Sequence, residues 1–209
     1  MQLKLSHTPA ALSANGLAAA VAWAAGGYAL SATTMNDQLG HLVTIAGIAV
    51  TDHSAKTFTV TGTDADGIAL TEGIAGPNGA VTVTTTKHFK TVTSITVSST
   101  TGADTFNLGW SAVAVSQTIC IDWRENSFEV SLGLIITGVI NYSIQHCLDN
   151  LRGTVAPVSL NWFPHSSLVA KTANADGNYA FPITATRLLI NSITAGATIQ
   201  TYVMQGLTA

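Results

Sequence analysis

Charge is what this sequence has least of. Only 9% of its 209 residues are charged and the formal net charge is −3, whereas roughly 25% of residues are charged in ordinary soluble domains. Mean hydropathy is +0.37. A lone soluble monomer usually carries more charge to stay dispersed. The shortage therefore indicates that other copies of the chain, or a lattice, cover much of the surface.

Basic residues are too few and too scattered to form a nucleic-acid site. No group of them could neutralise a row of phosphates, so we expect no specific nucleic-acid partner. The eight basic residues are Lys4, Lys56, Lys87, Lys90, Arg124, Arg152, Lys171 and Arg187.

Cysteine is equally scarce, since Cys120 and Cys147 are the only two in the sequence. They lie in different apolar, strand-like segments, and two cysteines do not make a disulfide framework. We expect two buried free thiols in a protein that folds in a reducing cytoplasm, with pairing across a sheet as the alternative.

Motifs of catalysis and cofactor binding are also missing. The six histidines show neither HxxxH nor HxH spacing, so the sequence predicts no metal site. It contains no nucleophile elbow, phosphate loop or dinucleotide fingerprint. We expect no catalytic residue and no cofactor.

The one long apolar stretch runs from Leu17 to Leu30. It is shorter than the ~20 residues needed to cross a bilayer, and Ser6 to Gly16 separates it from the N-terminal lysine, unlike a signal peptide. Gly26-Gly27 argues against one long helix. We expect a buried strand or an assembly arm here, and no membrane partner.

Short strands separated by turns dominate the sequence from His41 onward. In the stretch from Phe58 to Trp110, Asp66-Gly67 and Asn78-Gly79 are dipeptides typical of two-residue hairpin turns. This spacing favours an antiparallel sandwich or small barrel over a parallel sheet. The candidate strands are HLVTIAGIAV, KTFTVTGT, IALTE, AVTVTTT, FKTVTSITVSS and DTFNLGW.

The sequence changes character after Trp110, which places a boundary near Ser111 to Ser116. Beyond it, Arg124-Glu125-Asn126 and Asp176-Gly177-Asn178 are turn candidates, and a last hairpin is expected from Thr184 to Gln205. The segment 181–206 repeats the plan of 89–110, in which a strand, a turn with glycine and a second strand follow one another. We predict an all-β chain of two small antiparallel β-sandwich or barrel (jelly-roll-like) modules, 41–112 and 113–209, after an extended N-terminal arm over residues 1–40.

Asp64-Ala65-Asp66-Gly67 begins like a calcium-binding loop. The twelfth position of such a loop falls on Ala75 instead of a glutamate. Glu72 is near enough in sequence to reach in, yet a hairpin turn already explains Asp and Gly here. We expect a turn without a metal.

His146, Cys147 and Asp149 have the residue types of a cysteine nucleophile and its base. Neighbours along a strand point to opposite faces, so a regular strand would keep the thiol and the imidazole apart. A glycosidase would need two carboxylates in one cleft. The acidic residues that come closest are Asp122, Glu125 and Glu129, and Asp122 and Glu125 fall on opposite faces of a regular strand.

Large aromatic residues next to polar ones are the candidates for an interface, because they offer much contact area at little entropic cost. Such residues can also plug the ends of a sandwich core. The candidates of this kind are Trp123, Trp162 and Phe163, and Trp23 and Tyr28 of the apolar stretch are further interface candidates.

Two parts of the sequence resemble known proteins. TFTVTGTDADGIALTEGIAGPNG, followed by KHFKTVTSITVSS and NLGW, resembles a module of virion structural proteins of tailed bacteriophages. YSIQHCLDN, then WF, then FPITATRLLINSITAGATIQTYVMQG is similar to the end of small phage head and tail proteins. The resemblance covers most of residues 41–206. It implies a non-enzymatic protein that folds in the host cytoplasm and is built into the virion.

The resemblance leaves the position in the particle open. A capsid decoration or minor head protein fits the low charge best, with a head–tail connector (neck or adaptor) or a tail or fibre component as alternatives. The expected partners are other copies of the chain, possibly in a trimer, and major capsid, neck or tail proteins. Unpaired strand edges would join the subunits. A rival reading is a carbohydrate-binding module for host-surface adsorption, with Trp123, Trp162 and Tyr179 as stacking platforms.

Overall fold

The chain folds almost entirely into β-strands. The computed structural model describes residues 1–24, 27–124, 128–151 and 159–206, and it is 58% strand and 1% helix. This confirms the all-β class with antiparallel sheets. The chain divides into two compact units. We call Leu12–Ala114 the N-terminal unit, and Met1–Ala11 with Val115–Ala209 the C-terminal unit.

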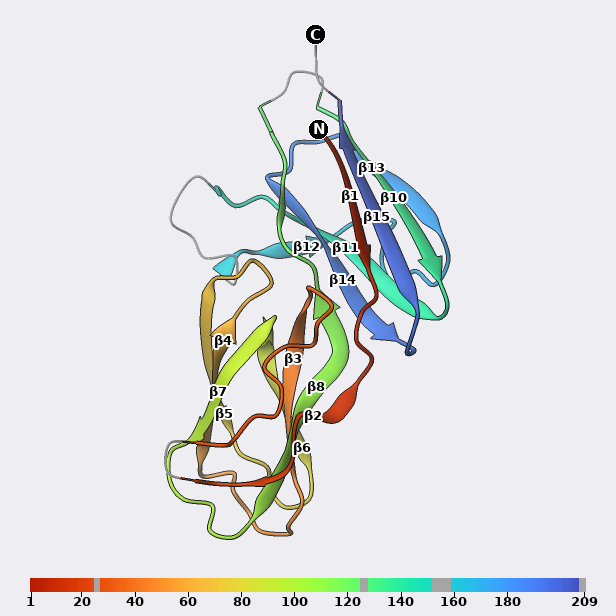
Figure 1. Ribbon diagram of the computed structural model, residues 1–209. Coiled ribbons are helices and arrows are strands. Elements are labelled where there is room, and N and C mark those ends of the chain that lie inside the picture. The colour runs from red at the N-terminus through yellow and green to blue at the C-terminus, as the bar shows by residue number, and fades with distance from the viewer. Residues whose placement is uncertain (25–26, 125–127, 152–158, 207–209) are drawn as a thin grey trace. The chain divides into compact units, whose positions relative to one another are not determined.

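The N-terminal unit contains two groups of antiparallel strands. One is β5 (Ala69–Ala75), β4 (Thr57–Thr63) and β7 (Thr91–Val97), in that order. The other is β8 (Thr105–Val115), β3 (Gly40–Gly47) and β6 (Thr82–Phe89), and β2 (Ser13–Ala22) pairs with β8. Figure 1 shows these strands. Every strand predicted between His41 and Trp110 is present.

Three aromatic rings lie at the centre of this unit. The ring centroids of Phe58 on β4 and Phe106 on β8 are 5.2 Å apart, and Tyr28 stacks on Phe58 at 5.8 Å. The hydroxyl of Tyr28 lies 3.1 Å from Oγ1 of Thr101. Because side chains alternate along a strand, Phe58 and Val60 of β4 both point inward and are fully buried. The apolar half of each strand therefore supplies the core.

Side chains and main chain cover the outer edges of the β5-β4-β7 sheet. On the β5 side, Nζ of Lys87 donates a hydrogen bond to the main-chain carbonyl of Thr71 at 3.0 Å. On the β7 side, Tyr28 donates its N–H to the carbonyl of Ile95 at 2.9 Å. Edge strands with free N–H and C=O groups invite pairing with another chain. These contacts occupy part of both edges.

The C-terminal unit also contains two groups of antiparallel strands. The first is β1 (Gln2–His7), β15 (Thr198–Gln205), β10 (Val130–Thr137) and β13 (Ala175–Tyr179), which lie side by side in Figure 1. The second is β12 (Trp162–Pro164), β11 (Ile140–Cys147) and β14 (Ala185–Ile193), and β9 (Ile119–Cys120) pairs with β14. Their buried residues include Leu132, Leu134, Tyr142, Ile144, Leu188, Ile190 and Val203.

The first forty residues do not form an extended arm. Gln2–His7 is strand β1, which pairs with β15 of the C-terminal unit. In the N-terminal unit, Leu17, Tyr28 and Leu39 are at most 5% exposed. Burial in the core of the same chain removes these apolar side chains from water without a neighbouring subunit. The observed division between the units falls after Ala114, where the sequence led us to expect 112. Gly26 of the expected Gly-Gly break lies outside the described residues.

The glycines of the turns have positive φ, but only some of these turns join strands that pair with each other. Gly67 has a φ of +82° and closes the hairpin from β4 to β5. Gly79 has a φ of +77°, but it connects β5 to β6, which belong to different sheets. Gly196, with a φ of +80°, likewise connects β14 to β15 across sheets, so the hairpin expected from 184 to 205 is not one. In both cases consecutive strands fold over a core instead of pairing alongside each other.

The two turn candidates of the C-terminal half have different outcomes. Asp176-Gly177-Asn178 is not a turn, because it lies within β13 and pairs with β10. Neighbouring strands satisfy the main chain there, which overrides the turn propensity of Asp, Gly and Asn. Of Arg124-Glu125-Asn126, Glu125 and Asn126 lie outside the described residues.

Replacing Tyr28 tests whether the segment expected to be an arm belongs to the core. Tyr28→Ala removes a buried ring and should lower the free energy of unfolding by about 3–5 kcal/mol. Tyr28→Phe removes only the contact with Thr101 and should cost about 1 kcal/mol. Trp23→Ala, in the same segment but only partly buried, is the control and should cost less than Tyr28→Ala. Urea unfolding measures all three, and a Tyr28→Ala variant as stable as the parent would contradict this assignment.

The carboxyl of Asp64 should make stability depend on pH. Its Oδ1 accepts the N–H of Asp66 at 3.0 Å and of Ile68 at 2.9 Å, yet burial raises its pKa above the usual value. The folded state therefore holds this proton more tightly than the unfolded state, and its contribution to stability grows as the pH falls. Relative to Asp64→Asn, the parent should gain stability as the pH falls from neutral toward the usual range of an aspartate.

Asp52 supplies a control of opposite sign. A hydrogen bond from the N–H of Ser54 lowers the pKa of Asp52, so the parent should lose stability relative to Asp52→Asn as the pH falls below the usual range of an aspartate. Urea unfolding at a series of pH values measures both differences. Equal slopes for the two variants would rule out this account of Asp64.

Candidate functional site

The acidic residues of the β4–β5 hairpin do not assemble into a metal site. Asp64 is only 6% exposed and its Oδ1 is bound to main-chain N–H groups of the turn. Glu72 binds the main chain of β6 instead of reaching toward the turn. Within the described residues, no three His, Cys, Asp or Glu side chains are placed to hold a metal ion together.

His146 and Cys147 end β11 and have separate surroundings. The thiol of Cys147 lies 3.5 Å from Oδ2 of Asp149, and burial raises its pKa. The His146 ring is packed against Tyr179, with the centroids 5.1 Å apart, and burial lowers its pKa. The imidazole thus lies among aromatic rings while the thiol bonds to a carboxylate. Among the acidic residues considered for a glycosidase, Asp122 binds the Arg124 side chain at 3.2 Å. Glu125 lies outside the described residues.

Both cysteines are free thiols. Cys147 is buried as expected, but Cys120 is exposed, which corrects the expectation that both are buried. The cause is the alternation within the two-residue strand β9, where Ile119 takes the inward position and Cys120 the outward one.

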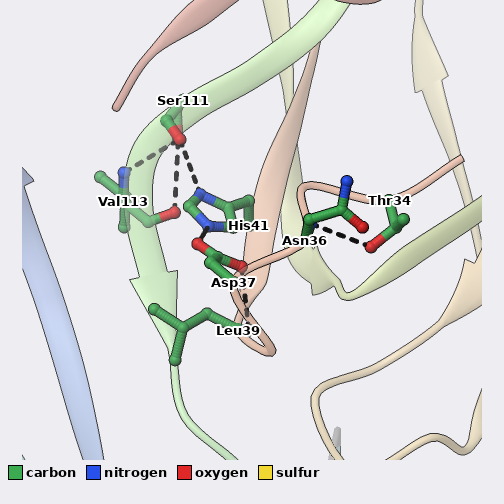
Figure 2. A network of polar contacts seen from close by, with 7 residues as sticks. All are labelled: Thr34, Asn36, Asp37, Leu39, His41, Ser111 and Val113. Carbon is green, nitrogen blue, oxygen red and sulfur yellow. Dashed lines mark hydrogen bonds and ion pairs between the residues drawn. The ribbon is translucent and has the colours of Figure 1, made fainter. Parts of the chain in front are cut away.

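Asp37, His41 and Ser111 form a polar contact that the sequence analysis missed (Figure 2). Nε2 of His41 lies 2.6 Å from Oδ2 of Asp37, and Nδ1 lies 2.9 Å from the main-chain oxygen of Ser111. Because a carbonyl oxygen only accepts, Nδ1 must carry a hydrogen. The Ser111 hydroxyl accepts the N–H of Val113 at 3.2 Å and lies 3.5 Å from the carbonyl oxygen of the same residue.

This contact fixes the chain inside the N-terminal unit. His41 is fully buried, and its ring joins the segment before β3 to residue Ser111 of β8. A serine nucleophile would need its hydroxyl at a free imidazole nitrogen, whereas both nitrogens of His41 are occupied. The spacing of Asp37 and His41, four residues apart, was the signal available in the sequence.

The interface candidates of the N-terminal unit are not on its open surface. Tyr28 is 5% exposed and lies in the core, so it offers no face to a partner, contrary to expectation. Trp23 is partly buried against the same core. Their segment is apolar enough to be drawn inward, and aromatic character alone did not reveal this.

The candidates of the C-terminal unit differ from one another. Trp162 and Phe163 are neighbours on β12 and point to opposite faces. The Trp162 ring carries the Arg187 guanidinium at 4.1 Å from its centroid. Phe163 is 47% exposed, and Trp123 is 43% exposed. Tyr179, expected as a stacking platform, is only 1% exposed. Trp123 and Phe163 are therefore the candidates that a partner can reach.

Trp123 and Phe163 belong to a larger apolar region that we call the aromatic surface, formed by Trp123, Leu148, Phe163, Phe181 and Pro182. Leu148 is 53% exposed and Phe181 is 49% exposed. Trp123, Leu148 and Pro182 line a depression of about 360 Å³ together with Asn150 and Thr184. None of these lining groups is ionisable.

The rings of the aromatic surface rest on a buried layer. His146 lies beneath Phe163 and Phe181, with centroid distances of 5.9 Å and 5.6 Å. Tyr179 also contacts Phe181, edge to face, at 5.6 Å. Burial raises the pKa of Tyr179 well above the usual value, so its hydroxyl stays protonated. This neutral, packed layer holds the exposed rings in place.

Leu148 and Phe181 were missed by sequence reasoning. For Leu148 the signal was available, because a buried Cys147 at the end of β11 puts the next side chain outward. For Phe181 it was not, since its position depends on a contact with His146 from a distant strand.

The aromatic surface can bind apolar groups. Fixed rings lose little entropy on binding and provide large contact areas. The nearby amide of Asn150 and hydroxyl of Thr184 could orient a ligand or a partner's main chain.

Comparisons with known proteins leave the function to be argued from these features. No family model matches the chain, and no curated protein matches it. In the described part of the chain, no helix is both long enough and apolar enough to span a bilayer.

Proposed function

We propose that this protein is a non-enzymatic structural component of a tailed-phage virion, with capsid decoration or minor head protein as its leading role. The observation that carries the proposal is the aromatic surface, where Leu148, Phe163 and Phe181 are each about half exposed. Monomers rarely leave such groups in water without a use. The low charge and the resemblance over residues 41–206 support the same conclusion.

Assembly would proceed mainly through side chains. In the N-terminal unit, the Lys87 side chain and the Tyr28 N–H already occupy main-chain carbonyls at the edges of the β5-β4-β7 sheet. Pairing of strand edges is thus less favoured there than burial of side chains. At the aromatic surface, Phe163 and Phe181 would enter pockets of a neighbouring subunit and exclude water, as the anchors of stable interfaces do.

The partners follow from this surface. Another copy of the chain, in a trimer or another ring, could cover it, and so could a major capsid protein. A neck or tail position would use the same anchors in a ring. In every case the protein would be assembled in the host cytoplasm and would end in the virion.

Substituting the two exposed phenylalanines tests the proposal. Phe163→Ser with Phe181→Ser should weaken association at least about 30-fold, because two interface anchors are worth about 2 kcal/mol or more. Sedimentation equilibrium measures self-association, and co-sedimentation with particles lacking this protein measures binding to other subunits.

Ile68→Ser is the matched control, since Ile68 is 42% exposed but lies at the β4–β5 turn of the other unit. It should leave association unchanged. Circular dichroism should show that the double variant keeps its fold. If the parent protein neither self-associates at high concentration nor binds the particles, the proposal fails.

A further inference from the structure

A second surface feature lies on the outer face of the β1-β15-β10-β13 sheet and shares no residue with the aromatic surface. The strand register places Lys4, Tyr202, Gly133 and Asp176 in one row across the four strands. Side chains alternate along each strand, and the neighbours Leu132 and Leu134 are buried. Gly133 therefore faces outward at the middle of the row.

Neither backbone conformation nor packing explains why this residue is glycine. Gly133 is not among the glycines with positive φ. A Cβ atom built on it would lie 3.7 Å from Cβ of Tyr202, which is an ordinary contact. Glycine inside a strand costs roughly 0.5–1 kcal/mol relative to alanine, and it often marks a place where another molecule approaches closely.

The missing side chain leaves a depression of about 300 Å³. Tyr202 forms one wall, and Asn174 and Asp176 form the other. Ile135, which is 46% exposed, closes one end. The floor is the main chain at Gly133, so a ligand can reach the sheet itself.

The walls carry an aromatic ring and hydrogen-bonding groups. The Tyr202 hydroxyl donates to Oε1 of Gln200 at 3.0 Å, and Nζ of Lys4 lies 5.4 Å from the ring centroid. Asn174 accepts the N–H of Ile136 through Oδ1 at 2.8 Å. Its side-chain NH2 group is therefore the end that can donate to a ligand. Asp176 is exposed and carries an acceptor carboxylate.

We propose that this depression binds one ring of a neutral carbohydrate. A sugar ring has an apolar C–H side that packs on tyrosine and hydroxyls that donate to a carboxylate and accept from an amide. The carboxylate of Asp176 in the wall disfavours an anionic ligand. This activity goes beyond the structural role proposed above and does not depend on it.

The test uses nuclear magnetic resonance with the full chain. D-glucose, D-galactose, D-mannose, N-acetyl-D-glucosamine and L-rhamnose are the probes, each titrated separately into the millimolar range. At least one should shift the backbone amide signals of Gly133, Asp176 and Tyr202 in a saturable way. If none of the sugars does so, or if the shifts lie elsewhere, the proposal is overturned.

Two variants decide whether the depression is the site. Gly133→Val fills it with a residue that favours strands, so thermal stability should be kept while affinity for the sugar falls at least tenfold. Ser131→Val, at the next outward position of β10, is the matched control and should bind as the parent does. Should Gly133→Val fail to fold, Asp176→Asn serves instead, with the same loss expected. Undiminished binding in a folded Gly133→Val or Asp176→Asn variant contradicts the assignment.

Discussion

The alternation of side chains along its strands is the constraint on which the rest of this structure depends. In strands such as β4 and β10, one face is buried and the other meets solvent. In β4, Phe58 and Val60 enter the core, and in β10, Leu132 and Leu134 do so. The outward positions of these two strands carry threonine, serine, glycine or isoleucine, and none of them is charged. The outer faces of these strands therefore carry little charge that could repel other molecules.

The connections obey this constraint too. Where consecutive strands bury their apolar faces against each other, the chain crosses from one sheet to the other, as at Gly79 and Gly196. Only the β4–β5 connection around Gly67 is a hairpin among these three glycine turns. Glycine supplies the positive φ in each case, and the packing of the following strand decides whether a hairpin or a crossover results.

This explains how far the sequence could predict the fold. Strand positions from His41 to Trp110 are local properties of β-branched residues and turn dipeptides, and they were predicted. Pairing is non-local: Gln2 lies opposite Met204, and no local pattern joins them. The first forty residues were misassigned for that reason, because their partners lie far along the chain.

The residues of the candidate site were likewise predicted where their position depends on local sequence and missed where it depends on distant strands. Trp123 and Phe163 were identified as large aromatic residues beside polar ones, and they are exposed. Tyr28 was also expected at an interface but is buried, since Phe58 and Phe106 pack against it. The depression at Gly133 could not be foreseen, because it requires the register of three strands.

We propose that the aromatic surface is where this protein contacts another protein. A density map of an assembled particle that contains this chain tests that claim most directly. The account predicts that Phe163 and Phe181 lie beneath a neighbouring subunit, with no solvent between. A map in which both rings face open solvent, while the particle is held together elsewhere, would contradict it.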